Sequence, residues 1–354
     1  MVESRFSDLI SPREPRLSSR SESNAELENH LSEIDGPHSS NHGYSMKGHI
    51  RDIEQAIVKS RRTTIIEAEK RQDLRRLPCR EIPKYGDKKL TYVSNYLYAY
   101  SKIVSKRFPR IWYVETGAGP GVCKVRGSDR TTLGTPLLAM TNEPQFTDVR
   151  LIECKRKLAH ALRERVRGYF PKVDADETVR TGDCNQLVSG ILSGIPKYDP
   201  VLLFIDSEGL EVKWQSVIVP ASQRGHIDML INFPYDDAIH RNIAKIVPGS
   251  EFERKVKEFM PNSDWEKCIQ EKYSDEHVCN DALREGFIEV YEAGLRELGM
   301  KYVLTSPPIR NKRNTAVYSF IFASKYEVAA KVMRDIFDKP DSAIQLTIEE
   351  LPDH

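Results

Sequence analysis

Residues 111–121, IWYVETGAGPG, combine a carboxylate with three alternating glycines. An apolar run reaches Glu115, and Gly117, Gly119 and Gly121 follow at every second position. Glycine lets a backbone turn tightly and lie against a ligand where a β-carbon would collide with it. Open α/β sheets bind their ligands at the carboxyl ends of their strands. The spacing therefore predicts a strand that enters a ligand-binding loop, although a glycine-rich turn without a ligand would show the same pattern.

Acidic residues at the ends of later strands extend this predicted site. Glu153 ends the run Asp148–Glu153, and a carboxylate there can accept hydrogen bonds from both ribose hydroxyls of a nucleoside. A solvated acid at a strand end is the alternative. Asp183, followed by Cys184, lies just past a short predicted strand. An aspartate at that place contacts the adenine amino group in nucleoside-binding folds, and it can also be an ordinary helix N-cap.

Two further strand ends carry polar residues that could act on an acceptor. Asp206 and Glu208 follow the apolar run 201–205, where a general base or an orienting group would lie. The sequence Asn232-Phe-Pro-Tyr235 matches the amine-orienting motif of nucleic-acid amino-methyltransferases, in which the Asn accepts from an exocyclic amine. That motif normally follows the fourth strand, and here it follows the fifth. A proline turn at a strand end is therefore the simpler interpretation.

Strands and helices must alternate to bring these strand ends together. The expected strands are 111–115, 148–153, 177–180, 201–205 and 227–231, followed by 301–305 and 316–322. The expected helices are 87–107, 136–140, 155–170, 214–219, 252–260, 264–272, 281–298 and 325–337, and residues 122–135 are expected to form a loop. Such βαβ units build a doubly wound sheet. A final pair of strands after a long helix is typical of seven-stranded methyltransferase sheets, whose last strand is antiparallel.

Composition narrows the class of protein. The chain has 53 basic and 52 acidic residues, so no global field directs it to nucleic acid or to a membrane. Its six cysteines form no Cys-x-x-Cys pair, which argues against a zinc ribbon or a disulfide scaffold. Cys268, His277 and Cys279 come nearest to a metal-binding pattern, and we expect no metal there. No apolar run is long enough to span a membrane, so we expect a soluble, cytoplasmic protein.

Short stretches of the chain resemble, in order, the three-Cys-motif partner (TcmP) family of predicted S-adenosylmethionine (SAM)-dependent methyltransferases. They are residues 89–97, 113–121, 134–139, 151–153, 182–185, 203–206 and 320–325. The resemblance implies a Rossmann-like fold and SAM contacts at Gly117, Gly119, Glu153 and Asp183. It also implies a three-Cys-motif protein as partner. Relatives tend to have Asp-Pro-x-Gly where this chain has Asp206-Ser-Glu-Gly209, which weakens the transfer of a catalytic role to Asp206.

We therefore predict a SAM-dependent methyltransferase of the TcmP type with a Rossmann-like, seven-stranded α/β fold and a helical N-terminal extension. Its acceptor stays open between nucleic acid, which local basic faces such as helix 155–170 could bind, and protein. A SAM-binding or partner-docking module without turnover is the alternative. The predicted cofactor contacts are Glu115, Gly117, Gly119, Gly121, Glu153, Asp183 and Cys184, and the predicted catalytic residues are Asp206 and Glu208.

The predicted domain begins well inside the chain. Residues 1–48 have too few apolar side chains to bury a face and are expected to be a disordered tail. Residues 49–86 form the helical extension, whose apolar stripe of Ile50, Ile53 and Ile57 packs on the domain or meets a partner. The methyltransferase-like domain then covers residues 87–337, and residues 338–354 form a C-terminal tail.

Overall fold

The computed structural model describes residues 46–70, 77–272 and 280–339. The chain divides into two units, residues 1–49 and 50–354, and the fold described below belongs to the second. Most of the predicted N-terminal tail and nearly all of the C-terminal tail lie outside the described residues, so the predicted domain boundaries stay predictions. None of the described helices has the length and apolar character that crossing a membrane would require.

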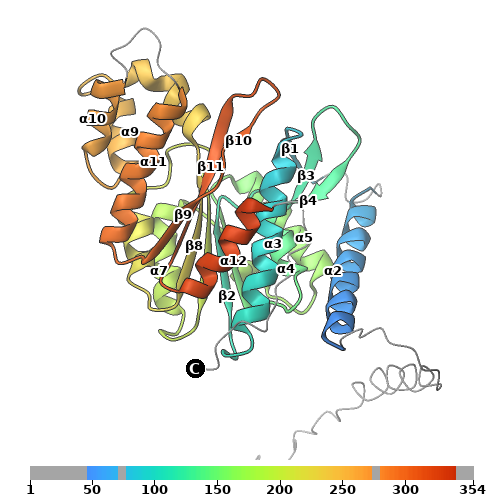
Figure 1. The fold of residues 1–354 in the computed structure, drawn as a ribbon. Coiled ribbons are helices and arrows are strands. Elements are labelled where there is room, and N and C mark those ends of the chain that lie inside the picture. The colour runs from blue at the N-terminus through green and yellow to red at the C-terminus, as the bar shows by residue number, and fades with distance from the viewer. Residues whose placement is uncertain (1–45, 71–76, 273–279, 340–354) are drawn as a thin grey trace, which may run out of the picture. The chain divides into compact units, whose positions relative to one another are not determined.

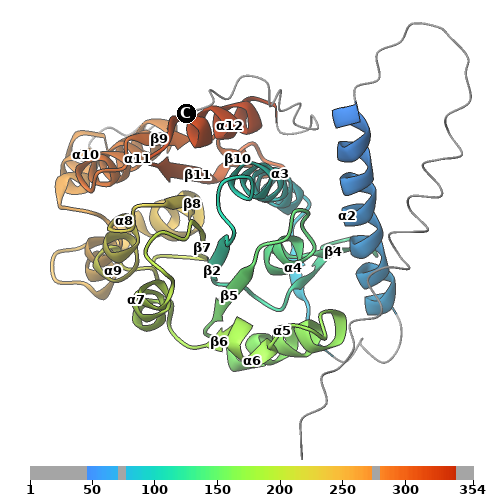
Figure 2. The same ribbon diagram turned by 90° about the horizontal axis from the view of Figure 1, so that it is seen from below.

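A mixed eight-stranded sheet forms the centre of this unit (Figures 1 and 2). Its strands are β2 (Trp112–Thr116), β5 (Asp148–Glu153), β6 (Val179–Thr181), β7 (Val201–Asp206), β8 (Ile227–Phe233), β9 (Tyr302–Thr305), β10 (Ile309–Arg310) and β11 (Ala316–Ser324). The path runs β6-β5-β2-β7-β8-β11, and β9 and β10 both pair with β11. Numbered along the chain without the two-residue β10, the order is 3-2-1-4-5-7-6. Only the last strand pairings are antiparallel, as β11 runs against β8 and β9.

This strand order is that of a Rossmann-like, seven-stranded methyltransferase sheet, so the predicted fold class is confirmed. The apolar runs explain the sheet, since every residue of β2, β7 and β8 is buried. Strands that are covered on both faces read as continuous apolar runs, because neither face meets water. Parallel strands also bring their carboxyl ends to one edge, where the predicted site residues lie.

Helices cover both faces of the sheet (Figure 2). One apolar cluster contains Leu202, Phe204 and Leu230, and the other contains the alternate residues Leu203 and Met229. The first face is covered by α3 (Gly86–Val104), α4 (Thr135–Met140), α5 (Arg156–Tyr169) and α12 (Glu327–Asp338). The second is covered by α7 (Cys184–Gly194), a π-helical turn (Trp214–Ile218), α8 (Val219–Ser222), α9 (Glu251–Phe259), α10 (Asp264–Lys272) and α11 (Asn280–Glu297).

The segment expected to be a loop between the glycines and α4 is instead a hairpin. It consists of β3 (Val122–Val125) and β4 (Thr131–Leu133), and β1 (Arg80–Ile82) adds a parallel strand to β3. In β3 the exposed Lys124 separates the buried Cys123 and Val125, and in β4 only Leu133 is buried. Strands of three or four residues are too short to show a clear period in the sequence. The pairing of β1 with β3 places Arg80 beside Gly119 of the glycine loop.

Helix α2 (Met46–Lys70) contacts the domain at both ends of its described length, since Glu54 pairs with Lys102 of α3 and Glu69 pairs with Arg165 of α5. Ile65 belongs to the first apolar cluster, whereas Ile57, which was expected on the same stripe, is 38% exposed. Arg165 of α5 is fully buried and donates hydrogen bonds to both carboxylate oxygens of Glu69, at 2.9 and 2.8 Å. Its Nη1 donates to the carbonyl of Pro120 in the glycine loop at 2.7 Å. One guanidinium therefore ties α2 to the glycine loop.

Candidate functional site

The three glycines after β2 have positive φ angles but different surroundings. A β-carbon on Gly117 would lie 2.3 Å from the backbone oxygen of Asp206, and one on Gly121 would lie 2.8 Å from Leu162. The only neighbour of a β-carbon on Gly119 would be an Arg80 nitrogen at 4.0 Å. Close packing alone therefore requires glycine at positions 117 and 121, while Gly119 faces open space in which a ligand could lie.

Glu153, at the end of β5, holds the glycine loop. Its Oε2 accepts a hydrogen bond from the backbone N–H of Gly119 at 2.8 Å, and its Oε1 accepts one from the N–H of Lys155 at 2.7 Å. The side chain is buried, with 5% of the residue exposed. The alternative of a solvated acid at the strand end is therefore wrong. Oε1 also accepts a weak hydrogen bond from the thiol of Cys154 at 3.7 Å, whereas Oε2 can still accept a second hydrogen bond, as from a ribose hydroxyl.

Glu115 lies behind the loop and not on a cavity wall. It is fully buried, accepts a hydrogen bond from the hydroxyl of Tyr113 at 2.9 Å and accepts a second from the hydroxyl of Thr135. Burial raises the pKa of Glu115 to about 8, against the opposing effect of the two hydroxyl groups. At neutral pH this predicted cofactor contact is thus mostly a neutral acid that joins β2 to the start of α4.

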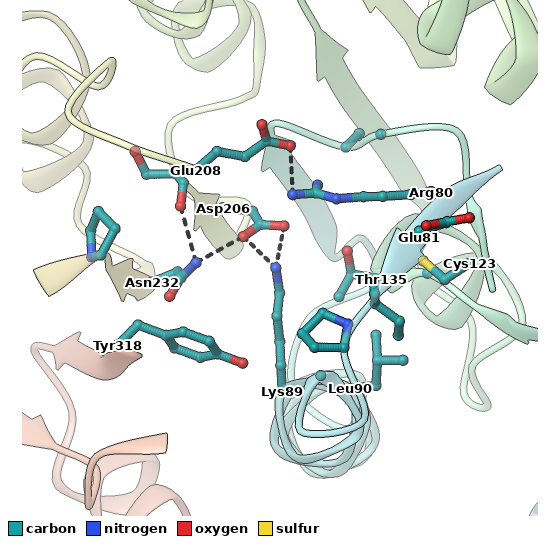
Figure 3. A pocket seen from close by; sticks show the side chains of 18 of the residues that line it. Arg80, Glu81, Lys89, Leu90, Cys123, Thr135, Asp206, Glu208, Asn232 and Tyr318 are labelled. Carbon is teal, nitrogen blue, oxygen red and sulfur yellow. Dashed lines mark hydrogen bonds and ion pairs between the residues drawn. The ribbon is translucent and has the colours of Figure 1, made fainter. Parts of the chain in front are cut away.

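A cavity of about 310 Å³ opens at the carboxyl ends of β2, β7 and β8, beneath β1 and the start of α3 (Figure 3). Of the predicted site residues, Gly119, Gly121, Asp206 and Glu208 line it. The remaining ones, Glu115, Gly117, Glu153, Asp183 and Cys184, do not line it. The structure therefore brings the glycine loop and the predicted catalytic acids together, whereas the predicted nucleoside contacts Glu153 and Asp183 do not line this cavity.

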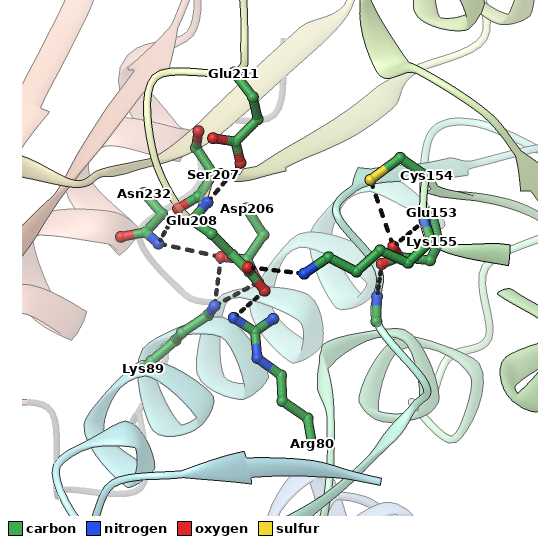
Figure 4. A network of polar contacts seen from close by, with 11 residues as sticks. Arg80, Lys89, Glu153, Cys154, Lys155, Asp206, Ser207, Glu208, Glu211 and Asn232 are labelled. Carbon is green, nitrogen blue, oxygen red and sulfur yellow. Dashed lines mark hydrogen bonds and ion pairs between the residues drawn. The ribbon is translucent and has the colours of Figure 1, made fainter. Parts of the chain in front are cut away.

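Both predicted catalytic acids are already paired with cations. Lys89 of α3 donates to both carboxylate oxygens of Asp206, and the side chains of this ion pair are 17% and 6% exposed. Glu208 pairs with Arg80 at 2.5 Å and with Lys155 at 3.3 Å (Figure 4). Each acid in the cavity thus has a cationic partner. Two of these cations, Arg80 and Lys89, come from the segment that precedes the glycine loop.

Sequence reasoning gave no role to Arg80 and Lys89. Arg80 could not be found, because its position depends on the β1–β3 pairing, which the pattern does not reveal. Lys89 did carry a signal. It precedes Val93 by four residues and Tyr96 by seven, so it lies on the buried face of α3 where a lysine requires a partner.

Asn232 presents an unpartnered oxygen in the same cavity. Its Nδ2 donates to Oδ1 of Asp206 and to the backbone carbonyl of Ser207, both at 3.1 Å. Because these two groups can only accept, the orientation of the amide is fixed, and Oδ1 points away from Asp206 (Figure 3). This oxygen is buried without a hydrogen-bond partner, as is the hydroxyl of Tyr318 on β11.

The position of Asn232 bears on its motif. Asn232 lies on β8, the fifth strand of the central sheet along the chain, as expected. Its partner in the neighbouring strand β7, the fourth, is Asp206. A proline turn at a strand end would not require a buried amide oxygen without a partner. Buried polar groups are normally hydrogen-bonded, so this oxygen marks a place for a donor.

Asp183 and the basic helix have structural explanations. The carboxylate of Asp183 caps α7 by accepting a hydrogen bond from the N–H of Asn185 at 2.9 Å, so its N-cap role is confirmed. In α5, Arg163 and Arg167 both pair with Asp176. The described part of the chain contains no cluster of metal-binding side chains. His277 and Cys279 of the weak metal pattern lie outside the described residues.

The sequence matches no protein-family model and no curated protein. Among solved structures, a protein of the DUF519 family from Legionella pneumophila shares 13% identity over 72% of this chain and 92% of its own, with a TM-score of 0.39. A putative O-methyltransferase from Klebsiella pneumoniae shares 12% identity over 84% of this chain and 96% of its own, with a TM-score of 0.37. The O-methyltransferase TomG from Streptomyces achromogenes, solved with SAM, shares 12% identity over 65% of this chain and 78% of its own, with a TM-score of 0.33. Matches this distant add nothing to what the strand order shows.

Proposed function

We propose that this protein is a SAM-dependent methyltransferase. The observation that carries the proposal is the hydrogen bond from the N–H of Gly119 to the carboxylate of Glu153. It sets a glycine loop and a strand-end acid side by side at the centre of a sheet with the methyltransferase strand order. A nucleoside that bears an amino-acid arm needs these two groups together, one for its ribose and one for the backbone approach of its arm.

The residues around this bridge fit the parts of SAM. The free acceptor position on Oε2 of Glu153 suits a ribose hydroxyl, and Asp183 suits the adenine amino group. Arg80 and Lys89 line the cavity, and although each is paired with an acid, their remaining N–H groups could donate to the carboxylate of the methionine arm. When bound, SAM supplies a methyl group on a positively charged sulfur. The chain contributes position and charge, which are the main requirements of such a transfer.

The acceptor that fits best is a neutral amine. Such a group can donate one hydrogen to the unpartnered Oδ1 of Asn232 and keep its nitrogen lone pair for the methyl group. An amide oxygen cannot take a proton, so Asn232 would orient the amine and not deprotonate it. The hydroxyl of Tyr318 offers a second contact in the same cavity. The exocyclic amines of nucleic-acid bases are neutral at pH 7, whereas a lysine side chain would first have to lose a proton to solvent, because Asn232 cannot take it. Both acceptors stay in the proposal.

The TcmP type and its partner belong to the same proposal. Their support is the ordered set of resembling stretches, above all the glycine loop and Gly182-Asp-Cys-Asn185. A three-Cys-motif protein is accordingly the proposed partner, and the cytoplasm the proposed location.

The test of SAM binding uses two glycines with the same backbone requirement. Gly119 and Gly127 have φ angles of +65° and +72°, and a β-carbon at either position would meet no atom closer than 4.0 Å. Only Gly119 lines the cavity, because Gly127 lies in the β3–β4 turn. Gly119→Ala should therefore weaken SAM binding at least about tenfold in calorimetric titration, whereas Gly127→Ala should lower the melting temperature similarly and leave the affinity unchanged.

The same titration can overturn the proposal. Wild-type protein that shows neither binding heat nor a rise in melting temperature with millimolar SAM is not a SAM enzyme. Equal weakening by both alanine variants would show that backbone strain, and not contact, had changed the affinity.

Turnover requires a separate assay. Radiolabelled methyl transfer into nucleic-acid and protein fractions should label an amine, and Asn232→Ala should slow it by about a hundredfold, since one oriented hydrogen bond in an active site has an effect of that order. Tight SAM binding with every fraction unlabelled would instead favour the binding module without turnover.

A further inference from the structure

A second cavity, of about 610 Å³, lies at the opposite edge of the sheet. It is enclosed by α3, the start of α12 and the first residues of β8, and α3 and α12 lie side by side in both views of the fold (Figures 1 and 2). None of the residues assigned to SAM or to its acceptor lines it. Its aromatic walls come from Tyr96, Tyr100, Phe108, His226 and Tyr326. The proposed methyl transfer therefore does not involve this cavity.

A buried carboxylate without a cationic partner lies in its wall. Asp228 is on β8, four residues before Asn232 and on the same face of the strand, about 13 Å away at the usual rise per residue. It is 6% exposed and accepts hydrogen bonds from the hydroxyls of Tyr96, at 2.7 Å, and Ser324, at 2.6 Å. Within the described ranges, no lysine, arginine or histidine pairs with it.

The charge state of Asp228 makes this arrangement costly. Burial raises its pKa to about 6, while the hydroxyls of Ser324 and Tyr96 act in the opposite direction. The carboxyl group is therefore largely ionised at neutral pH, although its partners are neutral. A buried charge is usually paired with an opposite charge, because neutral hydrogen bonds do not replace all of the lost hydration.

A second polar atom in the same wall lacks a partner. The hydroxyl of Tyr100, one helical turn after Tyr96 on α3, is buried and forms no hydrogen bond. Two neighbouring groups of the cavity thus point to a bound group that donates several hydrogen bonds.

The remaining walls favour a cation with an apolar body. The rings of His226 and Tyr326 are stacked with their centroids 5.7 Å apart, and Phe108 meets His226 edge to face at 5.0 Å. Aromatic faces attract cations as well as apolar groups. The other charged side chains of the lining, Lys106, Arg107 and Glu327, are exposed, so water screens their charges.

We propose that this cavity binds a small organic amine in its ammonium form, with the ammonium group between Asp228 and the hydroxyl of Tyr100 and its apolar body against the aromatic walls. An ammonium group has three donors and a positive charge, so it supplies what both groups lack. A neutral alcohol would fill the cavity but leave the carboxylate uncompensated. A carboxylic acid would bring a like charge to Asp228.

Two probes of equal shape test the proposal. Benzylamine and benzyl alcohol differ in the charged group and share the apolar body. Titrated calorimetrically into the full chain at pH 7.5 without SAM, benzylamine should bind at least tenfold more tightly than benzyl alcohol. Asp228→Asn keeps the shape of the side chain and one acceptor oxygen, and the second hydroxyl can turn to accept from the new amide group, but the charge is removed, so the variant should abolish this preference.

Two tyrosine variants locate the binding and guard against a folding defect. Tyr100→Phe should weaken benzylamine binding several-fold, because it removes the unpartnered hydroxyl. Tyr318→Phe, the matched change in the other cavity, should leave it unchanged. Equal affinity for the amine and the alcohol in wild-type protein would overturn the proposal. So would full benzylamine affinity in Asp228→Asn or, if that variant does not fold, in Tyr100→Phe.

Discussion

The two edges of the central sheet treat a buried aspartate in opposite ways. Asp206, at the carboxyl end of β7, and Asp228, at the amino end of β8, are both 6% exposed and both face α3. Lys89 of α3 pairs with the first, whereas the second receives, from the residues that the structure describes, only the hydroxyls of Tyr96 and Ser324. The same helix thus supplies a cation at one edge and a neutral hydroxyl at the other. Two carboxyl groups that are buried to the same extent therefore differ in whether their partner carries a charge.

Glu115 supports this conclusion from the cofactor edge. Like Asp228, it accepts hydrogen bonds from one tyrosine hydroxyl and one aliphatic hydroxyl, those of Tyr113 and Thr135. Burial raises the pKa of Glu115 and of Asp228 alike. Hydroxyl partners therefore do not offset the loss of water at either edge.

The largest expected effect is the contrast between two identical substitutions. Asp206→Asn should lower the free energy of unfolding by about 3 kcal/mol, because it leaves the mostly buried Lys89 without its partner. Asp228→Asn should change it by less than about 1 kcal/mol, since it removes a charge that had no partner. Urea unfolding of both variants at pH 7 measures the difference.

A double variant serves as the control for this contrast. Adding Lys89→Met to Asp206→Asn should recover part of the lost stability, as it removes the unpaired charge. Equal losses in the two single variants would show that the edges do not differ as the contacts indicate.

A smaller effect concerns the pH dependence of stability. The pKa of Asp228 is higher in the folded protein, at about 6, than the ordinary value of 3.8 for an aspartic acid. Between these two values the folded protein binds the proton more readily, so this group's contribution to stability is full at low pH and is lost as the pH rises. Relative to Asp228→Asn, the wild type should therefore lose stability between about pH 4 and pH 6. Urea unfolding of both proteins at pH 4, 5, 6 and 7 checks this sign. If the free energy of unfolding of the wild type rose with pH relative to that of Asp228→Asn, the prediction would be wrong.

The smallest effect is expected at Glu115. Its pKa of about 8 means that the carboxyl group is already mostly neutral at pH 7, so Glu115→Gln replaces one neutral group by another of similar shape. We expect the free energy of unfolding to stay within about 0.5 kcal/mol of wild type. The measurement is thermal unfolding at pH 7, with Glu115→Ala as the control that loses the hydrogen bonds. A large loss in the glutamine variant would show that Glu115 is charged in the folded protein.

The sequence sufficed for the features that depend on local pattern. The runs that end at Glu153 and Asp206 became β5 and β7, the two parallel neighbours of β2 in the predicted sheet. The run before Asp206 is continuously apolar, which is typical of a strand covered on both faces. The N-cap at Asp183 was likewise legible from its position before a helix.

The rest of the site depends on contacts that no local pattern contains. The ion pair of Lys89 with Asp206 joins residues 117 positions apart, and the hydrogen bond of Gly119 to Glu153 spans 34. The β1–β3–β4 sheet that delivers Arg80 consists of strands too short to show a period. Sequence therefore located the strand ends, while tertiary packing determined which partners met there.

Arg165 makes the N-terminal helix inseparable from the domain. Its guanidinium is shared among Glu69, the carbonyl of Pro78 and the carbonyl of Pro120. A chain that began at residue 77 would keep this buried cation and lose its only carboxylate, a defect that typically costs about 3 kcal/mol. A piece that starts after Glu69 should therefore be less stable than one that keeps it, and a foreign helix in place of α2 should restore the stability only if it brings an acid to the same place.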